Sequence, residues 1–548
     1  MVKSSTRNPG KKKYKYPGVS EVVQRSRFNV LQESRWIVLA LAIIVYGWNF
    51  WGTSIYMLDE AKNAGSAAEM IRRADYLVPT FNNEFHDKPA LQYFFMIAGY
   101  KLFGVNAFGA RIFSVLMGIL SVMSIYLFSR KILNERTAFF ASIIYIASLQ
   151  MAVQFRLAVP DPYLLFCLTT GWFCFYLGYK EGGTKYLYAF YALIGLAFLA
   201  KGPIAFALPG LSILIFLVSQ RDLSFKRLAK LKIIPGVLIT LLIGLPWYVA
   251  SGLATDWEWP KYFFFTHNID RYVNTFEGHG GFPFDVVVIA IAALLPSSVV
   301  MPQAVVLAVK SRKDNQFFPF ALSICAAVLG FFFFSKTLLP SYPSPCIPFL
   351  AVLLGFYIQQ QSTSNTALKI SAVVALIICL AIPVAAYIAI DQDILLSGLS
   401  NRWMLFLVAP VGAIIALYFV INDEVAKAFY TWTGSFMVLL ILVFTWLLPQ
   451  VDAQNPVVKS KDILNGELAY YKRINAAFVF EVGKPIPKLE TPVEVNEFIK
   501  AHPNAKIIST RSDWEEIGEV NFKVIFRSKD LLESPESIIV TPLFGGNH

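Results

Sequence analysis

The chain has 548 residues, of which 56% are hydrophobic and 15% charged, and its formal net charge is +12. A soluble domain carries roughly 45–50% apolar and about 25% charged residues, so an ordinary soluble enzyme and a disordered chain are both excluded. In a membrane protein a positive excess indicates cytoplasmic loops beside lipid headgroups, so we expect membrane lipids rather than nucleic acid as partners.

The first 35 residues are polar and basic, with Lys11, Lys12, Lys13 and Arg35 among them. The apolar run that begins at Trp36 is too long for a signal-peptide core, and no small-residue cleavage site follows it. We therefore expect residues 1–35 to form a cytoplasmic segment, followed by a retained first membrane span.

Residues 36–448 contain recurrent apolar runs, which at about 20 residues per span predict about thirteen transmembrane helices. Basic residues mark alternate connections, for example at Arg130, Lys180, Arg227 and Lys310, as expected for cytoplasmic loops. The odd number of spans places the C terminus outside. The predicted starts lie near residues 36, 107, 136, 161, 184, 203, 231, 284, 317, 343, 367, 402 and 429.

Two outer loops are long, residues 52–106 and residues 252–283. In the first loop, small and apolar residues recur at helical spacing from Ala64 to Ile71, and Leu91–Phe103 is apolar but short for a span. We expect both stretches to be helices that lie in the membrane interface.

Ionic side chains gather on the outer side of this predicted topology. A charge at membrane depth costs roughly 2.5–3.5 kcal/mol, so such residues are expected to pair or to line a watery cavity. Cations there suit a phosphate, and a carboxylate can accept the proton of an alcohol. The acids are Asp59, Glu60, Asp87 and Asp161, and the cations are Lys88, Arg156, Lys201, Arg271 and Lys336.

Each of these residues also has a purely structural interpretation. Asp59-Glu60 and Asp161-Pro162 suit the first turn of a helix, and Lys201 can extend its amine toward the interface. The shared side of the membrane, rather than any single residue, is what favours a functional site.

Residues 449–548 differ in composition, with twelve Lys or Arg against fourteen Asp or Glu. Short strand-like and helix-like runs alternate there, which predicts a small extracytoplasmic α/β domain. The expected strands are 477–482, 506–510, 522–526 and 538–540, and the expected helices are 493–502 and 513–517.

The order of the outer motifs resembles a known family, the lipid-phosphate-dependent integral-membrane glycosyltransferases of the C-type superfamily. The similarity is greatest to bacterial aminoarabinose transferases that modify lipid A and to protein O-mannosyltransferase-like enzymes, and it covers roughly residues 36–350. The motifs are Asp59-Glu60, His86-Asp87-Lys88-Pro89, Arg156 with Asp161-Pro162, Lys201-Gly202-Pro203, His267-Asn268 with Arg271, and Ser335-Lys336 with Pro340 and Tyr342.

The resemblance implies an inverting glycosyltransferase at the periplasmic face of a bacterial inner membrane. The donor would be a sugar, with 4-amino-4-deoxy-arabinose as a candidate, on polyprenyl (undecaprenyl) phosphate. The acceptor would be lipid A, another glycan or a protein. The donor supplies the energy and the sequence has no Gly-x-x-x-x-Gly-Lys loop, so no nucleotide is expected.

Two other functions stay open. One is a protein O-glycosyltransferase of the same architecture, which the sequence does not distinguish. The other is a lipid or solute transporter or flippase, although transporters often contain internal repeats and the sequence shows none.

The resemblance also implies residue roles. Asp59, Lys88, Asp161 and Lys201 would be catalytic, with Lys201 paired with the acidic site, and Lys88, Arg271 and Tyr342 would hold the lipid phosphate. The ionic cluster adds Glu60 to the catalytic candidates and Arg156 and Lys336 to the phosphate-binding ones.

A divalent metal such as zinc would fall on Asp87 and His267 in that family, although the residues themselves require no cofactor. The sequence departs from the family pattern at two positions: Asp87 stands where a glutamate is usual, and Ala90 replaces a second proline.

Overall fold

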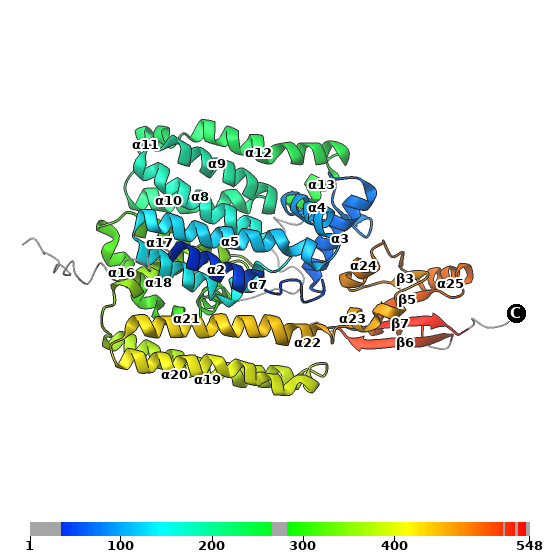
Figure 1. Ribbon diagram of the computed structural model, residues 1–548. Helices are drawn as coiled ribbons and strands as arrows, with labels where there is room; N and C mark the ends of the chain where they lie inside the picture. Colours follow the sequence, from blue (N-terminus) through cyan, green and yellow to red (C-terminus); the bar gives the residue numbers. More distant parts are fainter. Residues whose placement is uncertain (1–33, 266–281, 519–520, 532–534, 544–548) are drawn as a thin grey trace, which may run out of the picture.

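The computed structural model describes residues 34–265, 282–518, 521–531 and 535–543. A bundle of helices forms the larger part, and its long members run roughly side by side (Figure 1). Helices α3 (Leu58–Arg73), α4 (Leu91–Phe103) and α13 (Glu258–Lys261) gather at one end of the bundle, next to a small β-sheet.

A helix begins within six residues of each predicted start, and the largest difference is at 402, where the 3-10 helix Ser397–Leu407 precedes α20. The bundle consists of α2 (Ser34–Gly47), α5 (Ala107–Ile132), α6 (Glu135–Ile146), α8 (Asp161–Glu181), α9 (Thr184–Lys201), α10 (Ile204–Ser219), α12 (Ile233–Ala254), α15 (Asp285–Ala293), α17 (Phe317–Phe333), α18 (Ile347–Gln360), α19 (Thr366–Gln392), α20 (Val408–Ile421) and α21 (Val425–Leu442). Shorter helices complete it at α7 (Leu149–Gln154), α11 (Phe225–Lys230), α16 (Met301–Lys310) and α22 (Leu448–Asp452).

By length and composition, five of the described helices can cross a membrane, or six if the pair bent by 114° at Asp285–Ala293 and Ser297–Lys313 forms one span. The chain is therefore a multi-pass helical membrane protein. Helix α6 has only 12 residues, so it is about 18 Å long, whereas the hydrocarbon core is about 30 Å thick. The total of thirteen crossings stays a prediction.

Helix α8 packs in the interior of the bundle through large aromatic side chains. Trp172 has no exposed area, and its indole nitrogen donates to the Ser212 hydroxyl on α10 at 2.9 Å. Phe173 stacks on Phe128 of α5 at a centroid distance of 5.3 Å. Because the apolar rings surround a satisfied polar pair, this part of the core is both dry and fixed in register.

The first outer loop folds into α3, a two-stranded sheet and α4. Asp59 and Glu60 lie in the first turn of α3, where carboxylates are favoured, and a left-handed Ala74 ends the helix. Small residues on the inner face let α4 come close, so that the Tyr100 hydroxyl donates to the Ala64 carbonyl at 3.1 Å. The small strands are β1 (Thr80–Phe81) and β2 (Glu84–Phe85).

The C-terminal part contains a five-stranded sheet of order β4-β3-β5-β7-β6. Strand β3 pairs in parallel with β4 and β5, whereas β7 pairs antiparallel with β5 and β6. The strands are β3 (Leu468–Tyr471), β4 (Lys488–Leu489), β5 (Lys506–Thr510), β6 (Phe522–Lys529) and β7 (Glu536–Pro542), and the helices are α23 (Pro456–Ser460), α24 (Ala476–Val482), α25 (Pro492–Ala501) and α26 (Arg511–Trp514).

One local expectation was wrong: residues 477–482 form helix α24 rather than a strand. The Asn475 side chain caps the helix by accepting from the Ala477 N–H at 3.0 Å, and Gly483 ends it with φ +71°. These cap residues were readable signals, but the short apolar run between them suits either structure.

The C-terminal part packs directly on the first outer loop. The Asn82 amide bridges Ile486, donating to its carbonyl at 3.1 Å and accepting from its N–H at 2.7 Å. The Leu531 N–H donates to the Tyr56 hydroxyl at 2.7 Å. The loop that carries Asp59 is therefore held from two sides, by the bundle and by the sheet.

Candidate active site

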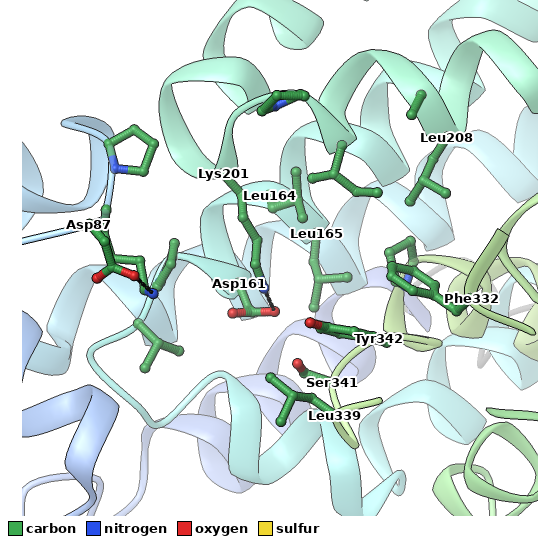
Figure 2. Close-up of a pocket in the computed structure, with 18 of the residues that line it drawn as sticks. Asp87, Asp161, Leu164, Leu165, Lys201, Leu208, Phe332, Leu339, Ser341 and Tyr342 are labelled. Carbon is green, nitrogen blue, oxygen red and sulfur yellow. Dashed lines mark hydrogen bonds and ion pairs between the residues drawn. The ribbon is translucent and has the colours of Figure 1, made fainter. Parts of the chain in front are cut away.

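A cavity of about 630 Å³ opens between the first outer loop and the bundle (Figure 2). Its polar lining comes from α3, the connection before α4, the start of α8, the end of α9 and the segment before α18. The polar residues are Asp59, Asn63, Asp87, Lys88, Asp161, Lys201, Ser335, Ser341 and Tyr342. Six of the residues that the sequence nominated thus share one cavity: Asp59, Asp87, Lys88, Asp161, Lys201 and Tyr342.

Two lysine–carboxylate pairs dominate the polar end. The Lys201 amine lies 2.8 Å from Asp161 Oδ1, and the Lys88 amine lies 2.9 Å from Asp87 Oδ2. In Figure 2, Lys201 reaches down to Asp161, and the hydroxyl end of Tyr342 points toward the same pair. The cavity therefore offers cations to an anionic ligand and carboxylates to a hydroxyl group.

The bundle-side pair is built from two helix ends. Asp161 begins α8, where a carboxylate is favoured, and Lys201 ends α9, where a cation is favoured. Gly202 then turns the chain with φ +71°, and a Cβ at this position would lie 2.5 Å from the Phe263 ring. Glycine at 202 thus lets the aromatic wall approach the end of α9.

The loop-side pair, Asp87 and Lys88, depends on buried polar contacts behind it. His86 has 5% of its surface exposed, and burial lowers its pKa to about 4, so it is neutral near pH 7. Its Nε2 lies 3.1 Å from Asn63 Oδ1, and its carbonyl accepts from the Trp259 indole at 2.8 Å. These contacts fix the backbone from which Asp87 and Lys88 reach the cavity.

Apolar side chains line the rest of the cavity. Tyr342 stacks on Phe332 at a centroid distance of 4.5 Å, which connects the polar end to the apolar wall. The apolar residues include Leu164, Leu165, Leu208, Phe263, Phe264, Phe331 and Leu339. A ligand with a charged head and a long hydrocarbon chain would match both ends.

The structure does not bring Glu60 to the cavity. Its carboxylate is 1% exposed and accepts from Arg111 Nε at 2.7 Å, Arg111 Nη2 at 2.8 Å and the Ala158 N–H at 2.8 Å. These three hydrogen bonds occupy most of the acceptor positions of the carboxylate, so Glu60 joins α3, α5 and the turn before Asp161 and does not line the cavity.

Two of the nominated cations also lie away from the cavity lining. Arg156 is buried, donates to the Val45 carbonyl at 2.5 Å and stands 3.7 Å from the Phe444 ring centroid. Lys336 is exposed, although its neighbour Ser335 lines the cavity. Arg271 and His267 fall outside the described residues.

Sequence reasoning missed Asn63, Ser341 and Arg111. Asn63 follows Asp59 by four residues on a helical segment, so it lies on the same face, and that spacing was an available signal. Arg111 lies inside an apolar run, and a buried arginine without a sequence neighbour gives no indication of which acid it meets.

Comparisons with known proteins agree with this architecture. The family model described as dolichyl-phosphate-mannose-protein mannosyltransferase matches residues 87–249. Undecaprenyl phosphate-alpha-4-amino-4-deoxy-L-arabinose arabinosyl transferase of Yersinia pestis (strain Pestoides F) is 27% identical over 445 residues, which are 78% of this chain and 79% of the relative.

Solved structures give the fold. The crystal structure of ArnT from Cupriavidus metallidurans bound to undecaprenyl phosphate matches with a TM-score of 0.78 and 18% identity, over 96% of this chain and 100% of that one. An oligosaccharyltransferase of Archaeoglobus fulgidus in the apo form matches with a TM-score of 0.50 and 11% identity, over 89% of this chain and 70% of that one. The resemblance inferred from the motif order is therefore confirmed, and the chain has the ArnT fold.

Proposed function

We propose that the chain is an inverting glycosyltransferase that moves a sugar from undecaprenyl phosphate to lipid A or another envelope acceptor at the periplasmic face of the inner membrane. The first candidate for the sugar is 4-amino-4-deoxy-L-arabinose, because the Yersinia relative is named for that transfer. The observation that carries the proposal is the single cavity in which two lysine–carboxylate pairs meet an apolar wall.

In the proposed reaction, an acceptor oxygen forms a bond to the anomeric carbon while the bond from that carbon to the phosphate oxygen breaks. The electron pair leaves with the polyprenyl phosphate, and the configuration at the carbon inverts. Lys88 and Tyr342, which line the cavity, hold the phosphate charge, and Arg271 and Lys336 are proposed to add to it. Fixed donors aimed at such a developing charge each contribute about 10²–10³ in rate.

Asp59 and Asp161 are the proposed acceptors of the proton from an acceptor hydroxyl. Where the acceptor is already a phosphate anion, no proton has to move, and the carboxylates orient groups instead. Lys201 fixes Asp161 through their 2.8 Å contact. Glu60 and Arg156 are buried and do not line the cavity, so we propose that they support the site and do not contact substrate.

The proposed topology follows from the difference between the two ends of the helix bundle. Residues 1–35 are a cytoplasmic segment, 36–448 the transmembrane unit with periplasmic loops 52–106 and 252–283, and 449–548 a periplasmic α/β domain. In support, α3, α4 and the sheet lie at one end of the bundle, and the basic helix α11 lies at the other (Figure 1). The positive-inside tendency makes the α11 end cytoplasmic.

We also propose Asp87 and His267 as ligands of a divalent cation such as zinc, which would supply further positive charge beside the phosphate. Among the described residues, no three His, Cys, Asp or Glu side chains gather as a metal site. Asp87 already has the Lys88 amine at 2.9 Å and His86 Nδ1 at 3.4 Å. The mechanism above therefore assigns no step to the metal, and metal analysis of the purified protein tests this proposal.

A second candidate function is protein O-glycosylation, which the family model for protein mannosyltransferases favours. Mass spectrometry of lipid A and of secreted proteins, from cells with and without the gene, separates the two. Loss of a pentose unit from lipid A supports the first function, and a mass shift on proteins supports the second. Unchanged envelopes with altered lipid or solute transport would favour a transporter instead.

A further inference from the structure

Asn63 is a buried polar hub behind the loop-side pair. Its Oδ1 accepts from Gln92 Nε2 at 3.0 Å and from the Tyr93 hydroxyl at 3.3 Å, and His86 Nε2 lies 3.1 Å away. Turning the amide over would place Nδ2 against the amide nitrogen of Gln92. With the Gln92 amide in this orientation, whose Oε1 likewise has no partner among the described residues, Nδ2 is the end of the Asn63 amide that these three contacts leave over.

The amide nitrogen of Asn63 has no hydrogen-bond partner among the described residues, although the side chain has no exposed area. Several other buried polar atoms in the described parts of the chain share this property, but of their residues Asn63 alone lines the cavity. Leaving a buried donor without a partner is unfavourable. Such a group on a cavity wall is suited to a ligand that supplies the missing acceptor.

The position of Asn63 on α3 indicates which part of a ligand it would meet. Asp59 and Asn63 are four residues apart on this helix and both line the cavity. An amide N–H and a carboxylate side by side suit a sugar hydroxyl, which accepts one hydrogen bond and donates another. The phosphate, by contrast, is matched by the lysines and the chain by the apolar wall.

Resting on the proposed function, we propose that Asn63 binds the sugar of the lipid-linked donor, with Nδ2 donating to a ring hydroxyl. Because the Asn63 side chain has no exposed area, the sugar reaches the amide only when lining side chains move aside. Asn63 thereby discriminates the sugar-linked lipid from the bare lipid phosphate.

The test compares two lipids on one protein. Dissociation constants for undecaprenyl phosphate and for undecaprenyl phosphate-linked 4-amino-4-deoxy-L-arabinose are measured by native mass spectrometry on the full chain. The variant Asn63→Asp keeps the oxygen that Gln92 and Tyr93 need and removes the N–H donor. Asn63→Ala serves as a second variant, and Asn82→Asp, whose amide contacts Ile486 outside the cavity, is the matched control.

We expect Asn63→Ala to weaken binding of the sugar-linked lipid by about five- to tenfold while the affinity for undecaprenyl phosphate changes less than twofold. Asn63→Asp also adds a negative charge beside the phosphate, so it should weaken both lipids, the sugar-linked one more. Asn82→Asp should leave the ratio of the two affinities unchanged. Equal loss for both lipids in Asn63→Ala, or no loss of the sugar-linked lipid in either Asn63 variant, overturns the assignment. If the wild-type protein binds both lipids but transfers no sugar, the proposed function fails, and the affinity ratio still decides the role of Asn63.

Discussion

The two sides of the cavity are built differently. On the bundle side, Asp161 and Lys201 occupy the ends of adjoining helices and need little beyond those helices to meet. On the loop side, Asp87 and Lys88 lie in a connection that is fixed by His86, Trp259 and the neighbouring C-terminal sheet. One side of the site is therefore local in origin, whereas the other depends on long-range packing.

The largest expected effect comes from removing Glu60, which connects the loop side to the bundle side through Arg111 and the Ala158 N–H. Glu60→Ala leaves Arg111 buried without its carboxylate, which should lower the free energy of unfolding by about 3–5 kcal/mol. The Ala158 N–H also loses its acceptor, so we expect Asp59, which adjoins residue 60, and Asp161, which follows Ala158, to shift. Thermal unfolding in detergent measures the change, and a melting temperature equal to that of the wild type would contradict the tie.

Lys88→Ala tests the loop side itself. We expect transfer to fall by about 10²–10³, because one fixed cation at the phosphate is lost, while the protein still folds. Lys101→Ala is the matched control, since Lys101 is exposed on α4 of the same loop and does not line the cavity. Near-normal turnover of Lys88→Ala in purified enzyme would remove Lys88 from the mechanism, and Asp59→Ala can be judged by the same assay.

Asp161→Asn tests the bundle side. Loss of the partner of Lys201 should lower turnover by about tenfold or more and destabilise the protein by about 1–2 kcal/mol, less than a fully buried pair because both side chains keep some exposure. Glu181→Gln at the other end of α8 removes the carboxylate of an exposed pair with Lys131, and a change under about 0.5 kcal/mol is expected there. Equal losses of stability in Asp161→Asn and Glu181→Gln would contradict a special role for the Asp161–Lys201 pair.

Asn82→Ala asks how far the loop side depends on the C-terminal sheet. Two hydrogen bonds to Ile486 are lost, which should cost about 1–2 kcal/mol. Because the loop carries Lys88, we expect turnover to fall by a few-fold, with the bundle unaffected. Limited proteolysis of the first loop, together with turnover, measures this. Unchanged loop protection would show that the sheet does not hold the loop.

The smallest effect concerns pH and the sheet alone. Burial raises the pKa of Asp530, so the native state retains its proton more strongly than the unfolded state. Its contribution to stability is present below the unfolded pKa of about 3.9 and is lost as pH rises through the native pKa. Asp530→Asn should therefore raise the melting temperature of the sheet at pH 7 and reduce its pH dependence.

Asp513 supplies a control of opposite sign. Its hydrogen bond from Arg473 lowers the pKa of the carboxyl, so its contribution is present above the unfolded pKa and is lost as pH falls through the native value. Asp513→Asn should flatten the acid side of the stability profile between about pH 5 and pH 2. Matching profiles for the two variants would contradict both assignments.

Much of the fold was readable from the sequence because long apolar runs leave few alternatives in a membrane. Helices were predicted at the starts where α2 to α21 lie, and the acids and lysines of the cavity were nominated from one side of the membrane. The prediction was wrong for a short apolar run, at α24, because its pattern of apolar residues suits a strand as well as a helix. The roles of Glu60 and Arg156 could not be predicted, because their partners, Arg111 and Phe444, lie far away in the chain.

The sequence by itself determined the multi-pass helical class, since backbone groups in lipid must be satisfied within each helix and only apolar segments enter it. It also determined which ionic residues could meet. The tertiary structure decided which of them do meet: Asp161 with Lys201, and Asp87 with Lys88, while Glu60 was taken by Arg111. The physical reason is that an ion pair depends on a few ångströms of separation, and only packing between distant helices sets that distance.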